Sequence, residues 1–227
     1  RANMLAIIDG TNIVRRFYHA GGTFSLPRFV DRVVKQTVAD RIVIAWDAKQ
    51  PYWRHELYAD YKAHRHDDPQ AAAFVRNVAR EAKGARIAGY YADGMEADDV
   101  AATLVATATE ECVVVTSDKD WCQLIADGAR WLAPINGGGL EERDEAWVWR
   151  FYSVGPGVWP DYVALAGDTS DNIPGVRGIG PRRAAEILRE HDAVAWALTA
   201  KGPDTAAAVE LWKRLATLRT DANLRAL

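Results

Sequence analysis

Short apolar runs alternate with amphipathic helical patterns along the first part of the chain. Apolar runs of strand length occupy residues 4–8, 42–46, 112–116 and 129–133. Apolar positions recur at helical spacing in residues 26–38, 71–82, 97–107 and 121–125. Because strands that alternate with helices form parallel sheets with crossover helices, the pattern predicts an α/β core in residues 1–140. After Asp144 the pattern becomes helical, which predicts a helical region in residues 141–227.

Acidic residues follow the predicted strands. Asp9 comes after residues 4–8, Asp47 after 42–46, and Asp118 and Asp120 after 112–116. Ligand sites in open α/β sheets lie outside the carboxyl ends of the strands, which is where these carboxylates are expected. Five more acids occur in two further motifs, GMEADDV and GDTSDN: Glu96, Asp98, Asp99, Asp168 and Asp171.

Each of these acids has an ordinary structural interpretation when it is taken alone. Asp9 or Asp47 could cap the helix that follows, and acids are favoured near helix N-termini and in turns. Nine carboxylates directed to one edge of a sheet repel one another and resist desolvation unless a cation lies among them. Oxygen ligands without His or Cys favour Mg²⁺ or Mn²⁺, and the number of acids suggests two ions. Two ions about 4 Å apart stabilise the attacking and leaving oxygens of a phosphoryl displacement.

A nucleophilic role for Asp9 can be tested on the sequence. Haloacid-dehalogenase-type phosphatases resemble this strand, but their nucleophile is an aspartate two residues before the Asp of Asp-Gly-Thr. That position holds Ile7 here. An isoleucine cannot attack a phosphate, so the sequence excludes this reading of Asp9.

Composition and charge narrow the function further. The 227 residues carry a net charge of −3, which disfavours a nucleic-acid partner at first sight. Without the nine acids above, 28 basic residues stand against 22 acidic ones, so the rest of the surface admits a polyanion. Only two cysteines are present, Cys112 and Cys122, which predicts a reducing cytoplasm rather than a disulfide framework. No apolar run approaches the roughly 20 residues of a membrane span.

The motifs together resemble the bacterial and phage 5′-nucleases of the flap endonuclease superfamily, which includes the N-terminal domain of bacterial DNA polymerase I. The resemblance is carried by IIDGTN at 7–12, AWD at 45–47, YADYKAHR at 58–65, GMEADDV at 94–100, TSDKDWCQL at 116–124 and GDTSDNIPGVRGIGPRRA at 167–184. It implies a PIN-like core with a central, mostly parallel sheet flanked by helices, followed by a helical region with a helix-hairpin-helix motif.

The resemblance also assigns roles to the acids. It implies that Asp9, Asp47, Glu96 and Asp98 serve one metal site, with Asp99 beside them. It implies that the remaining four serve a second site: Asp118, Asp120, Asp168 and Asp171. All nine positions are acidic here.

Residues 52–93 correspond to the helical arch of the family, which admits a single-stranded 5′ end. Within it, the resemblance implies that Lys62 stabilises the reacting phosphate and that Tyr61 stacks on a base. Arg54 and Arg65 are expected to contact phosphates, and Arg16 falls on another basic position of the family. By pattern alone, this segment is equally a solvated amphipathic helix with extended Lys and Arg side chains.

The stretch GVRGIGPRRA at 175–184 predicts a glycine-rich hairpin that opens a helix, with Pro181 in the first turn. A single Gly-x-Gly is usually only a turn. The resemblance implies a helix-hairpin-helix motif that grips the backbone of duplex DNA and can hold K⁺. The residues that it implies for DNA binding are Gly175, Gly178, Gly180, Arg182 and Arg183.

The expected function is therefore a divalent-metal-dependent 5′-nuclease that acts on DNA with a 5′ flap, 5′ overhang or nick, as a monomer. Two alternatives remain open. A non-catalytic DNA-structure binder would be expected to lack some of the acids, and a PIN-type ribonuclease would lack the helix-hairpin-helix motif. The sequence does not separate exonuclease from flap endonuclease preference. We expect a stand-alone nuclease rather than part of a polymerase, because no polymerase pattern follows the last helical segment.

Overall fold

The computed structural model describes residues 3–21, 23–66, 68–136 and 138–227. The chain forms two compact units, each of which is discontinuous in sequence. The first unit comprises Arg1–Tyr52, Asp67–Arg143 and Arg219–Leu227, and the second comprises Trp53–His66 and Asp144–Leu218.

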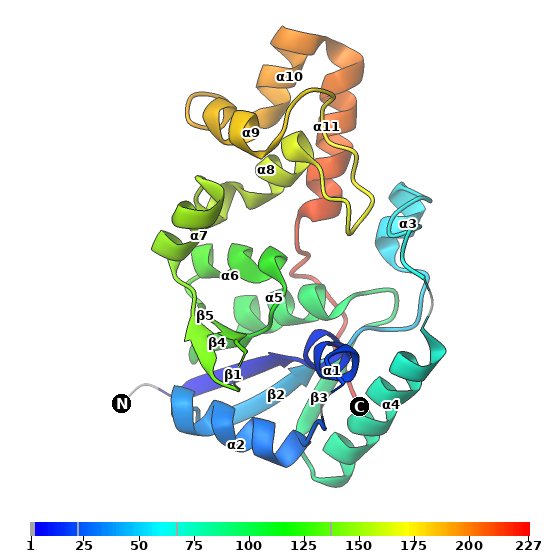
Figure 1. The fold of residues 1–227 in the computed structure, drawn as a ribbon, viewed down its shortest axis with the longest axis vertical. Helices are drawn as coiled ribbons and strands as arrows, with labels where there is room; N and C mark the ends of the chain where they lie inside the picture. The colour runs from blue at the N-terminus through cyan, green and yellow to red at the C-terminus, as the bar shows by residue number, and fades with distance from the viewer. Residues whose placement is uncertain (1–2, 22, 67, 137) are drawn as a thin grey trace. The chain divides into compact units, whose positions relative to one another are not determined.

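The first unit is built on one sheet with the strand order β6-β5-β4-β1-β2-β3-β7 (Figure 1). Its strands are β1 (Met4–Asp9), β2 (Arg41–Ala45), β3 (Ala88–Tyr91), β4 (Glu111–Val115), β5 (Arg130–Pro134), β6 (Leu140–Glu142) and β7 (Arg225–Ala226). Its helices are α1 (Gly10–His19), α2 (Leu26–Thr37), α4 (Pro69–Gly84), α5 (Ala97–Thr107), the 3-10 helix η1 (Lys119–Cys122) and α6 (Gln123–Ala126). Strands β1 to β5 are parallel, and the two edge strands β6 and β7 pair antiparallel.

The apolar run of β1 explains its central place in the sheet. All six of its residues are buried, as expected for a parallel strand with helices on both faces. Ala6 and Ile8 belong to the core beneath α1, α2 and α4, together with Phe29 and Val33 of α2. The alternate side chains point to the other face, where α5 packs on β1 and β2 (Figure 1).

The second unit is helical. Its helices are α3 (Trp53–Leu57), α7 (Glu145–Tyr152), the 3-10 helix η2 (Pro156–Val158), α8 (Trp159–Ala166), α9 (Pro181–Ile187), α10 (Ala193–Lys201) and α11 (Pro203–Ala216). Helix α11 packs against α3, α8 and α10, and α9 packs against α7 and α8. Proline stands in the first turn of α8, α9 and α11, where its missing N–H leaves no helical hydrogen bond unmade.

The predicted fold class is confirmed, and each predicted strand and helix lies within a few residues of an observed one. Strands β3, β6 and β7 were not predicted, because they have only two to four residues and show no clear alternation. In the part of the chain that the structure describes, no helix is both long and apolar enough to cross a bilayer.

The division of the chain differs from the predicted linear split at residue 140. Residues 219–227 return to the first unit, where β7 pairs with β3. The predicted arch, residues 52–93, is also divided. Helix α4 packs against α1, and β3 is a strand of the sheet, so only Trp53–His66 belongs to the second unit. Helix α4 was assigned to the arch because its apolar stripe does not reveal which surface it covers.

Candidate functional site

Asp9 is the last residue of β1 and the N-cap of α1. Its carboxylate accepts hydrogen bonds from the Asn12 N–H at 3.0 Å and from the Thr116 hydroxyl at 2.7 Å. The residue is 3% exposed. Burial, and next the negative charge of Asp47, hold the pKa of Asp9 well above its usual range, and Asp118 adds to this effect. The carboxylate at the end of β1 is therefore repelled by the carboxylates that follow β2 and β4.

Two threonines hold the loops that carry these acids. The Thr116 hydroxyl, which donates to Asp9, also accepts the Asp118 N–H at 3.0 Å. The Thr11 hydroxyl accepts the Asp47 N–H at 3.0 Å, so it ties the end of β2 to the start of α1. Thr11 is expected to shape the turn that presents Asp9, but the hydrogen bonds of the two hydroxyls were not predicted. Each threonine lies two positions from an acid, in DGTN and VVVTSD, and this spacing is the signal that could have identified them.

A third tie joins the ends of β1 and β4. The side-chain oxygen of Asn12 accepts hydrogen bonds from the Ser117 N–H at 3.1 Å and from the Ser117 hydroxyl at 2.6 Å.

Gly10 allows the start of α1 to lie close to the end of β2. A Cβ at Gly10 would lie 2.6 Å from the side chains of Ile44 and Trp46, so any larger residue would separate α1 from β2.

Helix α5 brings its acids to the same rim. The side chain of Asp47 accepts the Ala97 N–H at 2.8 Å, so an acid after β2 caps a helix 50 residues later. Glu96, which precedes that helix, is 4% exposed. The Tyr52 phenol lies in the field of these two acids. Burial, together with Asp47 and Glu96, raises the pKa of Tyr52 well above its usual range. No role was predicted for this residue.

Asp98 and Asp99 diverge, because adjacent helical residues point about 100° apart. Asp98 is partly exposed, whereas Asp99 is fully buried. The Asp99 carboxylate accepts the Arg219 N–H at 2.9 Å. Through this contact the Asp99 carboxylate holds the returning C-terminal segment.

Asp118 and Asp120 lie in one turn after β4. The Asp118 side chain caps η1 by accepting the Asp120 N–H at 3.1 Å. Asp120 forms an ion pair with Lys119 at 3.6 Å. Both acids are partly exposed, so solvent or a ligand can reach this turn.

The acids of the first unit form an electrostatic cluster rather than a finished coordination sphere. In the ranges that the structure describes, no three His, Cys, Asp or Glu side chains form a group that could hold a metal ion. The donor chemistry still fits a hard divalent cation, because it consists of carboxylate oxygens and includes a buried carboxylate that its neighbours repel. Both cysteines are buried and neither forms a disulfide.

Asp171 organises the predicted cationic residues of the second unit. Its carboxylate accepts the Tyr61 hydroxyl at 2.9 Å and the Arg65 guanidinium at 2.7 Å. The Lys62 ammonium lies 3.7 Å from it. Lys62 also donates its backbone N–H to the Asp171 carbonyl at 3.0 Å, from a left-handed conformation with φ of 57°. The motifs around residues 61 and 171 therefore meet, although 110 residues separate them.

Two expectations for this segment are corrected. Tyr61 is 2% exposed and its hydroxyl faces Asp171, so its ring cannot stack on a base. Arg54 is 1% exposed and donates to the Leu215 carbonyl at 2.8 Å. Its guanidinium also lies 4.6 Å from the centre of the Trp53 ring. Burial therefore makes Arg54 a packing residue that joins α3 to the end of α11, rather than a phosphate contact.

The loop from Gly167 to Gly180 is closely packed at its base and open at its tip. The Asp168 side chain accepts both the N–H and the hydroxyl of Ser170 at 2.7 Å. A Cβ at Gly175 would lie 2.4 Å from the Gly167 nitrogen, so the two backbone segments touch. In contrast, a Cβ at Gly178 or Gly180 would meet no atom within 4 Å. The tip therefore has room for the close approach of a partner.

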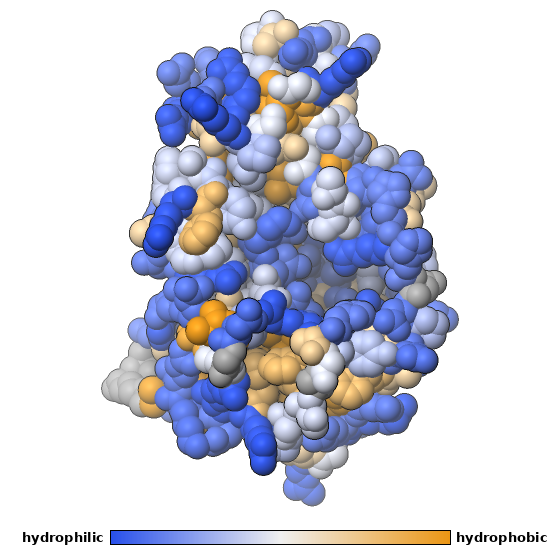
Figure 2. Space-filling view, in the orientation of Figure 1, coloured by the Kyte–Doolittle hydropathy of each residue, from blue (hydrophilic) through white to orange (hydrophobic). Residues whose placement is uncertain are grey.

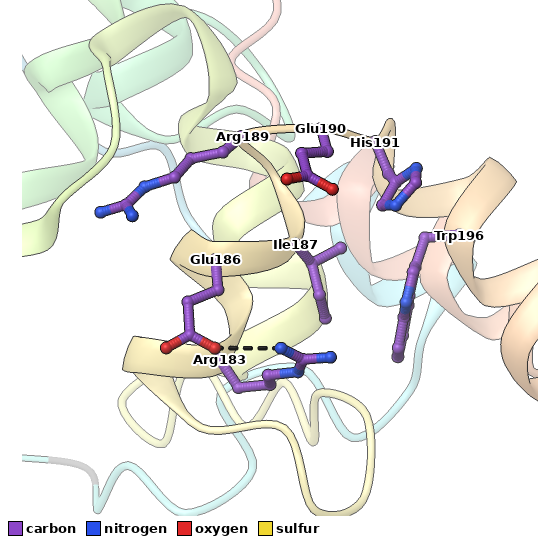
Figure 3. A pocket seen from close by; sticks show the side chains of 7 residues that line it. All are labelled: Arg183, Glu186, Ile187, Arg189, Glu190, His191 and Trp196. Atoms are coloured by element: carbon purple, nitrogen blue, oxygen red, sulfur yellow. Dashed lines mark hydrogen bonds and ion pairs between the residues drawn. The ribbon is translucent and has the colours of Figure 1, made fainter.

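Arg182 and Arg183 extend from α9 and share one acid. Arg182 pairs with Glu186 at 3.2 Å and Arg183 pairs with it at 3.0 Å. The hydrogen bond with Arg183 is the main cause that lowers the pKa of Glu186. Arg183 and Glu186 line a pocket of about 300 Å³ whose other walls include His191 and Trp196 (Figure 3). Arg16, the last predicted basic residue, is exposed on α1.

Comparison with known protein families assigns both parts of the chain. Residues 4–152 match the model of the 5′-3′ exonuclease N-terminal resolvase-like domain, and residues 154–226 match the 5′-3′ exonuclease C-terminal SAM fold. Together the two matches cover nearly the whole chain.

Individual relatives agree with these matches. The chain is 34% identical over 203 residues to flap endonuclease Xni of Salmonella heidelberg (strain SL476), covering 81% of this chain and 76% of the relative. It is also 34% identical over 203 residues to the thermostable DNA polymerase I of Thermus aquaticus. This second match covers 81% of this chain but 23% of the polymerase, so the chain spans about a quarter of that relative.

Solved structures share the fold. The T5 D15 protein, co-crystallised with metal ions, gives a TM-score of 0.75 at 21% identity, covering 94% of this chain and 86% of that chain. The catalytic core of Rad2 in complex with DNA substrate gives a TM-score of 0.56 at 18% identity, covering 83% of this chain and 61% of that chain.

Proposed function

The chain belongs to the 5′-3′ exonuclease family, and from this we propose that it is a structure-specific 5′-nuclease that hydrolyses DNA phosphodiesters with divalent cations. The proposal includes its expected substrates, which are DNA with a 5′ flap, a 5′ overhang or a nick. The observation that carries it is the group of carboxylates at the ends of β1, β2 and β4, where Asp9 is buried and repelled by Asp47 and Asp118.

The proposed cofactors are two Mg²⁺ or Mn²⁺ ions. The ligands that we propose in the first unit are Asp9, Asp47, Glu96, Asp98, Asp118 and Asp120. The family resemblance assigns Asp168 and Asp171 to metal binding as well, and the proposal keeps them. When bound, such ions supply positive charge to the attacking and leaving oxygens of a phosphodiester.

The residues around the acids have their own tasks in this proposal. Thr11, Thr116 and Asn12 fix the backbone at the three strand ends, so the carboxylates keep their positions when a cation binds. In the second unit, Lys62 and Arg65 are proposed to contribute positive charge to the substrate phosphates. Both now pair with Asp171, which orients them and balances their charge until a phosphate is present.

The proposed duplex contact is the hairpin at 175–184. The open positions at Gly178 and Gly180 support it, since backbone amides there can approach a phosphate without hindrance from side chains. Arg182, Arg183 and Arg16 are exposed and can contact the DNA backbone. A K⁺ ion at the hairpin, a monomeric state and a cytoplasmic location complete the proposal.

A cleavage assay tests the function. The protein is incubated with a labelled 5′-flap duplex, with Mg²⁺ or with EDTA, and we expect cleavage only with Mg²⁺. Asp118→Ala should lower the rate by more than about 100-fold, since loss of residues that merely support metal ligands already costs 10- to 100-fold. Asp127→Ala, an exposed acid after α6, is the matched control and should cut like the wild type.

The same assay separates the alternatives. A flap that survives Mg²⁺ while the protein still binds the duplex would identify a non-catalytic DNA-structure binder. Preferential cleavage of a matched single-stranded RNA would identify a ribonuclease. Equal cleavage rates of Asp118→Ala and the wild type would contradict the metal-dependent mechanism.

A further inference from the structure

Helix α7 carries large aromatic side chains on its solvent-facing sides. Phe151 is 57% exposed and Trp149 is 46% exposed, so water reaches both side chains. Trp147 and Phe151 lie four residues apart on one flank of the helix, and their ring centres are 4.2 Å apart. Trp149 lies between them in sequence and therefore occupies another flank, close to Gly155. The pair of Trp147 and Phe151 is called the α7 aromatic pair below.

The aromatic pair is supported by rings beneath it. Tyr152 lies 6.2 Å from Trp147 on one side and 4.7 Å from Trp159 on the other, measured between ring centres. Trp159 is completely buried. A surface ring that rests on a buried aromatic core loses little conformational freedom when a ligand covers it. The pair is therefore a rigid apolar surface, in which Phe151 is exposed and Trp147 is partly buried.

Positive charge lies next to the pair. The guanidinium carbon of Arg150, an exposed residue, is 5.7 Å from the centre of the Phe151 ring. The acids of this helix, Asp144 and Glu145, lie at its N-terminal end, where Asp144 caps the helix through the Trp147 N–H. Figure 2 shows apolar atoms beside strongly hydrophilic ones at the place of α7 in Figure 1. Flat rings next to an arginine match an unpaired nucleotide, which offers a planar base and an anionic phosphate.

We propose that the α7 aromatic pair, with Arg150, binds unpaired bases of single-stranded DNA. This inference rests on the proposed function, because it takes DNA as the substrate. It adds a binding site outside the acids, the Lys62 segment and the hairpin at 175–184. Helix α7 packs against α9, the helix that this hairpin opens, so the pair lies on an element next to the proposed duplex contact.

A protein partner fits this surface less well. Stable protein interfaces bury about 800 Å² per partner, with a continuous apolar centre. The α7 pair consists of two rings beside a charged side chain, and Trp149 is turned to a different flank. Two rings suffice for one or two stacked bases, each of which contributes enough to be measured.

The test measures binding without cleavage. Fluorescence anisotropy in EDTA compares a labelled oligothymidine with a blunt duplex of the same length, for the full chain. We expect Phe151→Ala to weaken oligothymidine binding by about fivefold or more, the lower end for one stacked base, with duplex binding unchanged. Phe151→Trp keeps a ring and should bind like the wild type, whereas Phe151→Leu keeps apolar bulk without a π face and should behave like Phe151→Ala.

Trp149→Ala is the matched control, since it removes a similarly exposed ring from the same helix, and it should leave both affinities unchanged. Three results would overturn the proposal. Phe151→Ala could bind oligothymidine as tightly as the wild type, Trp149→Ala could lose as much affinity as Phe151→Ala, or Phe151→Leu could bind as tightly as the wild type. A dimer of the wild type in sedimentation that Phe151→Ala abolishes, with unchanged oligothymidine affinity, would identify a protein interface instead. Flap cleavage by the wild type with Mg²⁺ tests the nuclease function separately, so that function can be confirmed even if the α7 aromatic pair does not bind single-stranded DNA.

Discussion

At the scale of single residues, two glycines of one hairpin have different roles. Gly175 has φ of 68°, and its Cα faces the backbone of Gly167 at a distance that leaves no room for a side chain. Gly180 has φ of −94°, which any residue adopts, and open space surrounds it. Packing therefore requires glycine at 175, whereas glycine at 180 is the N-cap of α9 and leaves room for an external partner.

This difference predicts opposite results for two substitutions. Gly175→Ala should lower the free energy of unfolding by about 2 kcal/mol or more, because it combines a backbone clash with a left-handed conformation. Gly180→Ala should cost about 1 kcal/mol at most, because alanine is a poorer N-cap than glycine but meets no neighbouring atom. If the hairpin tip contacts DNA, Gly180→Ala should still weaken duplex binding. Urea unfolding and anisotropy measure the two effects, and equal destabilisation by both variants would contradict this account.

At the scale of elements, helix starts depend on side chains that accept backbone N–H groups. Asp192 caps α10 by accepting the N–H groups of Val194 and Ala195 at 2.9 and 3.0 Å. The hydrogen bond from Ala195, and the charge of Lys213 on α11, lower the pKa of Asp192. The same residue thus begins one helix and pairs with the next.

The cap makes stability depend on pH. Asp192→Ala should lower the free energy of unfolding by about 1 kcal/mol at pH 7. Because the folded pKa of Asp192 is lowered, its contribution is complete above the unfolded pKa of about 3.9 and is lost as the pH falls through the folded pKa. The difference between wild type and Asp192→Ala in urea unfolding should therefore shrink as the pH falls below about 4. Asp192→Asn keeps an accepting oxygen, so it should lower the free energy of unfolding less than Asp192→Ala does, and its effect should depend less on pH. If the effect of Asp192→Ala is the same at every pH, the charge of Asp192 does not contribute.

At the scale of the whole molecule, the first unit is completed by residues far away in sequence. The segment 219–227 is held by Asp99, by the Thr103 hydroxyl, which accepts the Ala222 N–H at 3.0 Å, and by the pairing of β7 with β3. Arg225 adds an ion pair with Asp93 at 2.8 Å. The segment therefore covers an edge of the sheet that would otherwise be unpaired.

The two acids that contact this segment should contribute differently to the free energy of unfolding. Asp99→Ala should lower the free energy of unfolding by about 1–3 kcal/mol, because the Arg219 N–H loses a charged acceptor at a buried residue. Asp93→Ala should cost less than about 1 kcal/mol, since that ion pair is exposed. Denaturant unfolding measures both, and limited proteolysis should cut the segment faster only in Asp99→Ala. Equal costs would show that Asp99 does not hold the segment.

Much of the fold and part of the site could be predicted from the sequence. The apolar runs that became β1, β2, β4 and β5 gave the parallel sheet, because burial on both faces leaves a local mark on sequence. The position of acids after these runs gave the rim at which Asp9, Asp47 and Asp118 meet, because parallel strands end at the same edge. The glycines at 175–180 gave the hairpin, since such turns depend on a few consecutive residues.

Only the tertiary structure decided which polar residues turn inward. Arg54 is buried against the end of α11, and Tyr61 is buried with its hydroxyl on Asp171. Asp99 faces the returning segment. Helix α4 covers the sheet, and β7 closes its edge. Each of these outcomes depends on a contact between residues separated by many positions in the chain. Local patterns determine how a segment folds and which faces are apolar, but the neighbour that covers a face is fixed by the packing of the whole chain.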